Sequence, residues 1–296
     1  MGKALAETSG AARDVYARAD AALGESISRL CFEGPLETLT LTANTQPALV
    51  ATSCALAAAL RERYPDLAAP AFAAGHSLGE YSALVAAGAL GLEDAVTLCR
   101  KRGQAMQEAV PAGQGAMAAV MGLDPAAVAE VCTQAAGDEV VAPANFNAPG
   151  QIVIAGHAGA VARASELAAA RGGKAIALKV SAPFHCALMR PAAERLAPAL
   201  QTANIAALSF PVVANVDGQP NSDPARVREL LLRQIDGPVL WAATVERMVA
   251  DGVTHALEIG PGKVLAGLCK RITKQLAVLS VHDAAALERV PAFLGA

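Results

Sequence analysis

Short apolar runs alternate along the chain with longer alanine-rich stretches in which apolar residues recur at helical spacing. The runs with strand character lie at residues 71–75, 211–216, 255–260 and 277–281. The stretches with helical spacing lie at residues 46–63, 78–90, 93–110 and 260–272, the last entered through a glycine turn. Strands that alternate with helices in this way are typical of an α/β fold with a parallel sheet.

The middle of the chain follows a different order. The pattern there predicts a strand, a helix, two strands, a helix and a strand, at residues 116–121, 125–136, 139–144, 151–155, 158–171 and 174–180. This β-α-β-β-α-β order is that of a ferredoxin-like unit. We therefore expect a small ferredoxin-like subdomain at residues 113–181, inserted in a large α/β domain formed by residues 1–112 and 182–296.

Composition and charge narrow the classes of function. The formal net charge of −3 gives no basic excess for binding nucleic acid. No apolar run reaches the roughly 18 residues of a membrane span, and residues 1–10 lack the apolar core of a signal peptide. The 6 cysteines are scattered and predict buried, reduced thiols. We expect a cytoplasmic monomer without a bound metal or cofactor.

Residues 75–79 carry Gly-His-Ser-Leu-Gly between a predicted strand and a predicted helix. In this context the pattern is typical of a nucleophile elbow, a turn so tight that side chains at the flanking positions would clash. Ser77 is then exposed at the carboxyl end of a strand, where open α/β sheets place their sites. The amide N–H of Leu78, at the start of the helix, would be free to stabilise an oxyanion.

A serine nucleophile needs a base, and the chain has 5 histidines. His185 lies where the chain leaves the predicted subdomain and re-enters the large domain, which is a natural edge of a cleft. Spacing favours His185 as the base but leaves His255 and His282 open. His76 is adjacent to Ser77, and we expect it to point away from the hydroxyl and to have a structural role.

Arg102 interrupts the amphipathic pattern of the predicted helix at residues 93–110. The residues three and four positions away are all apolar: Leu98, Cys99, Ala105 and Met106. A guanidinium on the buried face needs an anion, because an unpaired buried charge is costly. That anion is either an internal carboxylate or a carboxylate of the substrate, and periodicity alone does not choose between them.

Taken together, these residues resemble the malonyl-CoA:acyl carrier protein transacylase family. The resemblance covers nearly all of the chain and includes TQPALV, GHSLGEYSALVAAG, NFNAPGQIVIAGH, APFHCALMRPAAERL, PVVANVDG, RQIDGPVLW and EIGPGKVLAGLCKRI. The known fold of the family is an α/β-hydrolase-like core with a ferredoxin-like subdomain. This fold agrees with the order of elements predicted above.

The resemblance implies a role for each residue of the site. Ser77 would carry the acyl group, His185 would be its base, and Arg102 would pair with the malonyl carboxylate. The main-chain carbonyl of Gln234 would orient His185 and replace the acid of a catalytic triad.

Further positions would bear on the acyl pocket. Gln46 and Asn145 match positions near it. Leu78 and Phe184 match malonyl-specific relatives, since methylmalonyl-specific relatives tend to have Gln and Ser there. A bulky Phe184 would leave little room for an α-methyl group, although one methyl discriminates by only about 1–3 kcal/mol.

The implied reaction is a ping-pong transfer of malonyl from malonyl-CoA to the phosphopantetheine thiol of acyl carrier protein, which supplies fatty acid biosynthesis. A trans-acting polyketide malonyltransferase, a serine esterase or thioesterase, and a non-catalytic binding relative are the alternatives. Acidic carriers would dock on basic groups, with Arg190, Lys263, Lys270, Arg271 and Lys274 as candidates.

The family also has a strand and a Gly-Gln-Gly-Ser-Gln turn ahead of the position of Met1. We expect a chain that includes them to be more active and more stable.

Overall fold

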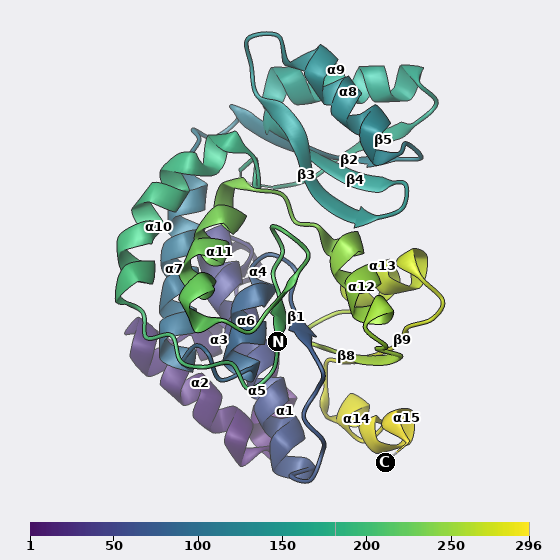
Figure 1. Ribbon diagram of the computed structural model, residues 1–296. Helices are drawn as coiled ribbons and strands as arrows, with labels where there is room; N and C mark the ends of the chain where they lie inside the picture. Colours follow the sequence, from purple (N-terminus) through teal and green to yellow (C-terminus); the bar gives the residue numbers. More distant parts are fainter. Residues whose placement is uncertain (181, 296) are drawn as a thin grey trace.

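The structure is a computed structural model that describes residues 1–180 and 182–295. It has a mixed α/β fold (Figure 1). In this view a four-stranded sheet lies at the top, and most of the helices gather below it around short strands. The predicted α/β class is therefore confirmed.

The first part of the chain is mainly helical. Its helices are α1 (Lys3–Thr8), α2 (Gly10–Leu23), α3 (Ile27–Glu33), α4 (Leu36–Leu39), α5 (Thr42–Arg63), α6 (Gly79–Ala86) and α7 (Leu92–Glu108). Helices α5 and α7 pack closely because Gly103 has no side chain. A Cβ there would lie 2.6 Å from the carbonyl oxygen of Thr42. This close approach brings Arg102 of α7 to Gln46 of α5.

The middle of the chain forms the predicted succession of strands and helices. Its elements are β2 (Gly115–Met121), α8 (Pro125–Ala136), β3 (Val141–Ala148), β4 (Gln151–His157), α9 (Ala158–Ala170) and β5 (Lys174–Ala177). The strands lie in the order β3-β4-β2-β5, and each neighbouring pair is antiparallel. Strand β3 continues past the predicted end at residue 144. The pairing of β3 with β4 shifts in register after Pro143 and after Phe146. These shifts interrupt the alternation of apolar and polar residues by which residues 145–148 could have been recognised as strand.

This antiparallel sheet packs on both of its faces. Helices α8 and α9 cover one face with apolar side chains (Figure 1). The other face packs Met117 and Val153 against Phe184 and Cys186. The segment that carries His185 is therefore held against the sheet.

The other strands form two sheets. Those predicted at residues 71–75, 211–216 and 255–260 are shorter than expected, the one predicted at 277–281 has the expected bounds, and a strand at Pro220–Asn221 was not predicted. Strands β1 (Ala73–Ala74), β6 (Val212–Val213) and β7 (Pro220–Asn221) form one sheet, in which β1 is parallel to β6 and β6 is antiparallel to β7. The parallel pair β8 (His255–Ile259) and β9 (Ala277–Val281) forms the other. The helix predicted at residues 78–90 ends earlier, because Gly88 takes a left-handed conformation with φ 75°.

The remaining helices surround these strands. They are η1 (Ala187–Met189), α10 (Arg190–Thr202), α11 (Pro224–Asp236), α12 (Trp241–Ala250), α13 (Val264–Ile272), α14 (Ala284–Leu287) and α15 (Val290–Leu294). The last turn of α11 carries Gln234. The cysteines are all buried and free, as predicted. Within the described residues, every helix is too short or too polar to span a membrane.

Candidate active site

Ser77 lies in a tight turn between β1 and α6. Its φ of 53° is in the left-handed region, which is rare for a residue with a side chain and marks a strained turn. Gly75 is required here, because a Cβ at this position would lie 2.0 Å from the carbonyl carbon of Gly79. The prediction that both flanking glycines avoid a clash is wrong for Gly79. A Cβ on Gly79 would meet no atom of the described chain within 4 Å.

His185 contacts the hydroxyl of Ser77 directly. The distance from Ser77 Oγ to His185 Nε2 is 2.7 Å. The other ring nitrogen, Nδ1, lies 2.9 Å from the main-chain carbonyl oxygen of Gln234. Since a carbonyl only accepts, Nδ1 carries the proton and Nε2 is left to accept one from Ser77.

The imidazole is held in its neutral form. Burial, reinforced by the positive charge of Arg102, lowers the pKa of His185 to about 3. His185 also has a left-handed φ of 62°, so strained backbone is found at both members of the pair. A neutral imidazole hydrogen-bonded to a serine hydroxyl can act as a general base at neutral pH.

The guanidinium of Arg102 is buried beside this pair. Its Nη2 donates to Ser77 Oγ at 2.9 Å and to the side-chain Oε1 of Gln234 at 2.9 Å. Its Nη1 donates to Oε1 of Gln46 at 2.7 Å. Among the residues described, Arg102 has neutral hydrogen-bond partners and no ion pair, and its Nε has no partner. Of the two anions that the sequence left open, the internal carboxylate is therefore not found in this part of the chain.

A cavity of about 280 Å³ opens in front of these groups. Ser77, His185, Arg102, Gln46, Leu78 and Phe184 line it, together with Thr40, Leu41, Thr42, Thr45, Met106, Lys179 and Val180. Asn145 is not among the lining residues. It is buried in β3, where it pairs with Val153 and forms a bridge to Val239. The structure thus brings together all the predicted substrate-side residues except Asn145.

The amide N–H of Leu78 has the position expected of an oxyanion donor. It follows Ser77 and has no hydrogen-bond partner in the part of the chain that the structure describes. The neighbouring His76 instead makes a contact of 2.8 Å with Oδ1 of Asn147. No contact joins His76 to the serine hydroxyl within the described chain, in line with the structural role predicted for it.

Two polar residues beside the elbow were not singled out from the sequence. Asn215 accepts the N–H of Ser77 at 2.6 Å and donates to the carbonyl of Gly75 at 2.7 Å. Glu80 is buried and accepts from the side chain of Gln234. Glu80 belongs to the motif GHSLGEY. The available signal in the sequence was an acidic residue one turn after the nucleophile, in a helix that is otherwise largely apolar. Asn215 lies in an apolar run that gave none.

Within residues 1–180 and 182–295, no group of three or more His, Cys, Asp or Glu side chains is arranged to hold a metal ion. The chemistry that the site offers is that of a serine nucleophile, a neutral imidazole and a fixed cation.

These features define a class of enzyme that forms an acyl-serine. In agreement, residues 1–292 match the acyl transferase domain family, and the chain belongs to that family. Among its relatives is the malonyl CoA-acyl carrier protein transacylase of Salmonella typhimurium. The two are 49% identical over 275 residues, which cover 93% of this chain and 88% of the relative.

Solved structures of similar proteins have the same fold. An acyl-carrier-protein-S-malonyltransferase from Bartonella henselae superposes with a TM-score of 0.96 at 48% identity, covering 100% of this chain and 95% of the other. A malonyl-transacylase solved in complex with its type II PKS acyl-carrier protein superposes with a TM-score of 0.94 at 43% identity, covering 100% of this chain and 95% of the other.

Proposed function

We propose that this protein transfers the malonyl group of malonyl-CoA to the phosphopantetheine thiol of an acyl carrier protein and so supplies fatty acid biosynthesis. The observation that carries the proposal is the buried guanidinium of Arg102, which lies 2.9 Å from Ser77 Oγ. Within the described chain Arg102 forms no ion pair with a protein carboxylate, and an anion from the substrate would supply one. The names of the relatives, malonyl CoA-acyl carrier protein transacylase among them, support the same substrate.

In the first half-reaction, Ser77 is the nucleophile and His185 the base. Nε2 takes the hydroxyl proton while Oγ bonds to the thioester carbon of malonyl-CoA. The N–H of Leu78 and the charge of Arg102 stabilise the negative charge that develops on the carbonyl oxygen of the thioester. The C–S bond then breaks, the proton on Nε2 passes to the sulfur, and CoA leaves a malonyl ester on Ser77.

The second half-reaction reverses these steps with a different thiol. The phosphopantetheine thiol of the carrier gives its proton to Nε2 of His185, and its sulfur bonds to the ester carbon. The bond from that carbon to Ser77 Oγ breaks, and Oγ regains the proton. The carbonyl of Gln234 keeps Nδ1 of His185 protonated throughout, so Nε2 serves both directions.

Arg102 would bind the free carboxylate of the malonyl group through charge-assisted hydrogen bonds. Gln46 and Gln234 hold the guanidinium in place from behind. Leu78 and Phe184 line the cavity at positions that limit the bulk of the acyl group. This arrangement favours an unbranched diacid monothioester over acyl groups without a carboxylate.

We also propose a division of the chain into a large α/β-hydrolase-like domain, residues 1–112 and 182–296, and a ferredoxin-like subdomain at residues 113–181. The antiparallel strand order β3-β4-β2-β5 and the separate apolar core under α8 and α9 support the subdomain. The strand, the elbow at Ser77 and the helix that follows support the hydrolase-like core.

The test is an intact-mass measurement after mixing with malonyl-CoA, followed by peptide mapping. We expect a malonyl adduct on the Ser77 peptide that disappears when holo acyl carrier protein is added, with malonyl-carrier as the product. Ser77→Ala should form no adduct. Release of free malonate in place of malonyl-carrier would instead identify an esterase. Parallel assays with a fatty acid carrier and a polyketide carrier separate those two partners by kcat/KM.

A further inference from the structure

Glu80 is a buried carboxylate that the proposed mechanism does not use. It lies on α6, one turn after Ser77, and is 3% exposed. One of its oxygens, Oε2, accepts two hydrogen bonds, from the main-chain N–H of Asn215 at 3.0 Å and from Nε2 of Gln234 at 2.8 Å. Two separate segments of the chain are therefore joined at a single oxygen atom.

Asn215, the first of these partners, braces the nucleophile elbow. Its side-chain Oδ1 accepts the N–H of Ser77 at 2.6 Å, and its Nδ2 donates to the carbonyl of Gly75 at 2.7 Å. The left-handed conformation of Ser77 is strained and persists only if the surroundings fix it. Asn215 supplies that restraint, and Glu80 holds the main chain of Asn215.

Gln234, the second partner, contacts Ser77, Arg102 and His185. Its Nε2 also donates to the main-chain carbonyl of Ser77 at 3.0 Å, and its Oε1 accepts from Arg102 at 2.9 Å. Its main-chain carbonyl accepts from Nδ1 of His185 at 2.9 Å. The amide group of Gln234 has only one orientation that satisfies both Arg102 and Glu80, with oxygen toward the cation and nitrogen toward the carboxylate. Arg102, the main-chain carbonyl of Ser77 and Glu80 all require this orientation, and Glu80 is the partner that holds the nitrogen end from the side away from Arg102.

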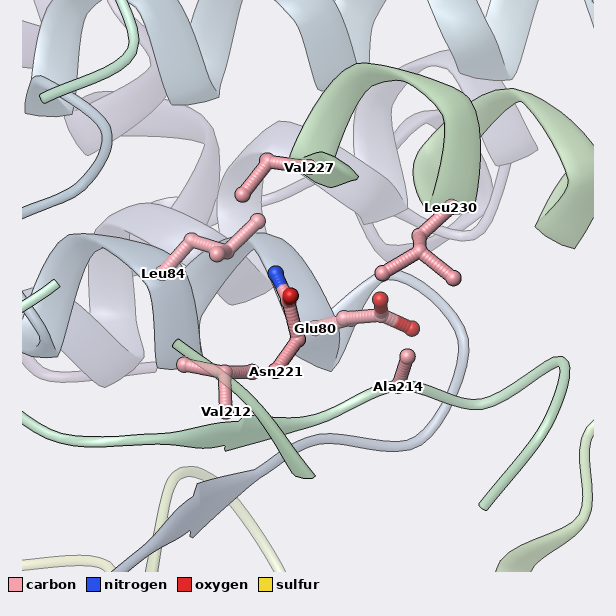
Figure 2. Close-up of a pocket in the computed structure, with 7 residues that line it drawn as sticks. All are labelled: Glu80, Leu84, Val212, Ala214, Asn221, Val227 and Leu230. Atoms are coloured by element: carbon pink, nitrogen blue, oxygen red, sulfur yellow. The ribbon is translucent and has the colours of Figure 1, made fainter. Parts of the chain in front are cut away.

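The surroundings of Glu80 separate it from the substrate. It lines a small cavity of about 10 Å³ together with Leu84, Val212, Ala214, Asn221, Val227 and Leu230 (Figure 2). It is not among the residues that line the cavity in front of Ser77. Glu80 therefore acts on the site indirectly, through its hydrogen bonds to Asn215 and Gln234 and through its electrostatic interaction with Arg102.

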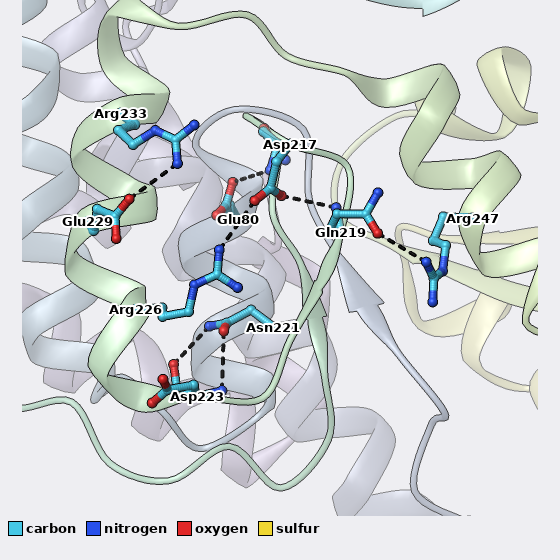
Figure 3. Close-up of polar contacts among 10 residues, drawn as sticks. Glu80, Asp217, Gln219, Asn221, Asp223, Arg226, Glu229, Arg233 and Arg247 are labelled. Atoms are coloured by element: carbon cyan, nitrogen blue, oxygen red, sulfur yellow. Dashed lines mark hydrogen bonds and ion pairs between the residues drawn. The ribbon is translucent and has the colours of Figure 1, made fainter.

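Two charged groups act on Glu80. Burial raises the pKa of the Glu80 carboxyl most, the hydrogen bonds from Gln234 and Asn215 and the charge of Arg102 lower it, and Asp217 raises it, which leaves the pKa at about 7. Asp217 lies in the turn between β6 and β7 and forms an ion pair with Arg226 at 3.5 Å (Figure 3). A buried carboxyl with a raised pKa beside a reactive group is typical of a functional site.

We propose that Glu80 is a positioning residue for acyl transfer, which orients the side chain of Gln234 and the Asn215 segment so that Ser77, His185 and Arg102 keep their mutual geometry. This inference rests on the proposed function. What it requires of residue 80 is a hydrogen-bond acceptor at the place of Oε2. Glutamine supplies such an acceptor through its amide oxygen, whereas methionine has a similar length and supplies none.

The test compares Glu80→Met, Glu80→Gln and the matched control Val227→Ala, which alters the same small cavity but none of the hydrogen bonds. Each folded variant is assayed for kcat/KM of Ser77 acylation with malonyl-CoA and with acetyl-CoA. For Glu80→Met we expect malonyl acylation to fall at least about tenfold and the malonyl-to-acetyl ratio at least about threefold, because Arg102 loses its brace. Glu80→Gln should stay within about threefold of the wild type on both measures, and Val227→Ala within about twofold.

Glu80→Ala replaces Glu80→Met if the latter does not fold. A malonyl-to-acetyl ratio in the acceptor-free variant equal to that of Val227→Ala would overturn the inference, because packing would then explain the whole effect. Equal losses in Glu80→Gln and Glu80→Met would overturn it too, because the charge and not the acceptor would be required. If the wild type forms no malonyl-serine, the proposed function fails first, so the two failures are distinguishable.

Discussion

Nη2 of Arg102 donates a hydrogen bond of 2.9 Å to Oγ of Ser77, although the two residues lie on different elements. The same cation lowers the pKa of His185, which contacts the same oxygen. One fixed positive charge therefore stabilises a serine alkoxide, keeps the base neutral and faces the space that an acyl group would enter. A substrate with a free carboxylate would therefore gain more from this charge than a simple acyl thioester does.

Arg102→Ala should therefore reduce malonyl transfer much more than acetyl transfer. Hydrogen bonds to charged groups contribute about 1.5–3 kcal/mol, so we expect the malonyl-to-acetyl ratio of kcat/KM to fall by about tenfold to a hundredfold. Lys101→Ala, which removes an exposed cation from the same helix, is the control and should leave the ratio unchanged. A ratio of the wild-type size in Arg102→Ala would remove Arg102 from substrate recognition.

The lowered pKa of His185 predicts an unusual pH profile. An imidazole with pKa of about 3 remains neutral, and able to accept a proton, across the range from pH 5 to 6.5. The kcat/KM for acylation, measured by rapid quench, should change by less than about threefold over this range. A histidine with an ordinary pKa near 6.5 would lose about tenfold or more. An acid limb with its midpoint near 6.5 would contradict the geometry described here.

The site was predictable from sequence where chemistry and local pattern coincide. Ser77 stands in a motif between a strand and a helix, and Arg102 interrupts an apolar helical face. His185 could be favoured only because it follows the inserted sheet. The contact of 2.7 Å between His185 and Ser77 depends on packing of Phe184 and Cys186 against that sheet. No periodicity in the sequence reports such a contact.

The fold was predicted least well where the sheets are short. The order in the chain of the four antiparallel strands and of the two helices between them was predicted correctly. Strands β1 and β6 contain two residues each, and the apolar residues beside them belong to turns packed in the same core. Buried turns and buried strands look alike in a hydrophobicity pattern, since both are apolar throughout. The same ambiguity concealed Asn215, whose role depends on a contact with Ser77 across the sheet.

The two glycines of the elbow should respond differently to alanine. In Gly75→Ala the new Cβ would lie 2.0 Å from main-chain atoms of Gly79, which have no room to move, so we expect loss of folding or of acylation. In Gly79→Ala the Cβ meets open space at the start of α6, where alanine favours the helix by about 1 kcal/mol. Gly79→Ala should keep its melting temperature or raise it, with acylation within about threefold of wild type. Equal damage in both variants would show that the constraint lies elsewhere.

The raised pKa of Glu80 makes the stability of the protein depend on pH in a direction that is uncommon for an acid. The folded chain holds this proton up to a pKa of about 7, whereas the unfolded chain releases it near the ordinary value of 4.5. Between these values the folded state binds the extra proton, so the free energy of unfolding falls as the pH rises, by up to about 1.4 kcal/mol per pH unit. Above pH 7 both states are ionised and the loss is complete.

Glu80→Gln removes this titration while it keeps the shape of the side chain. Relative to the wild type, its free energy of unfolding should therefore rise from pH 5 to pH 7 and then stay level, as measured by urea denaturation at several pH values. His185 contributes the opposite slope, because its lowered pKa costs stability as the pH falls below 6.5. That contribution is common to both proteins and cancels in their difference. Val227→Ala keeps the carboxyl of Glu80, so its free energy of unfolding should change with pH in parallel with that of the wild type. A constant difference between Glu80→Gln and the wild type would mean that Glu80 titrates at its ordinary pKa in the folded protein.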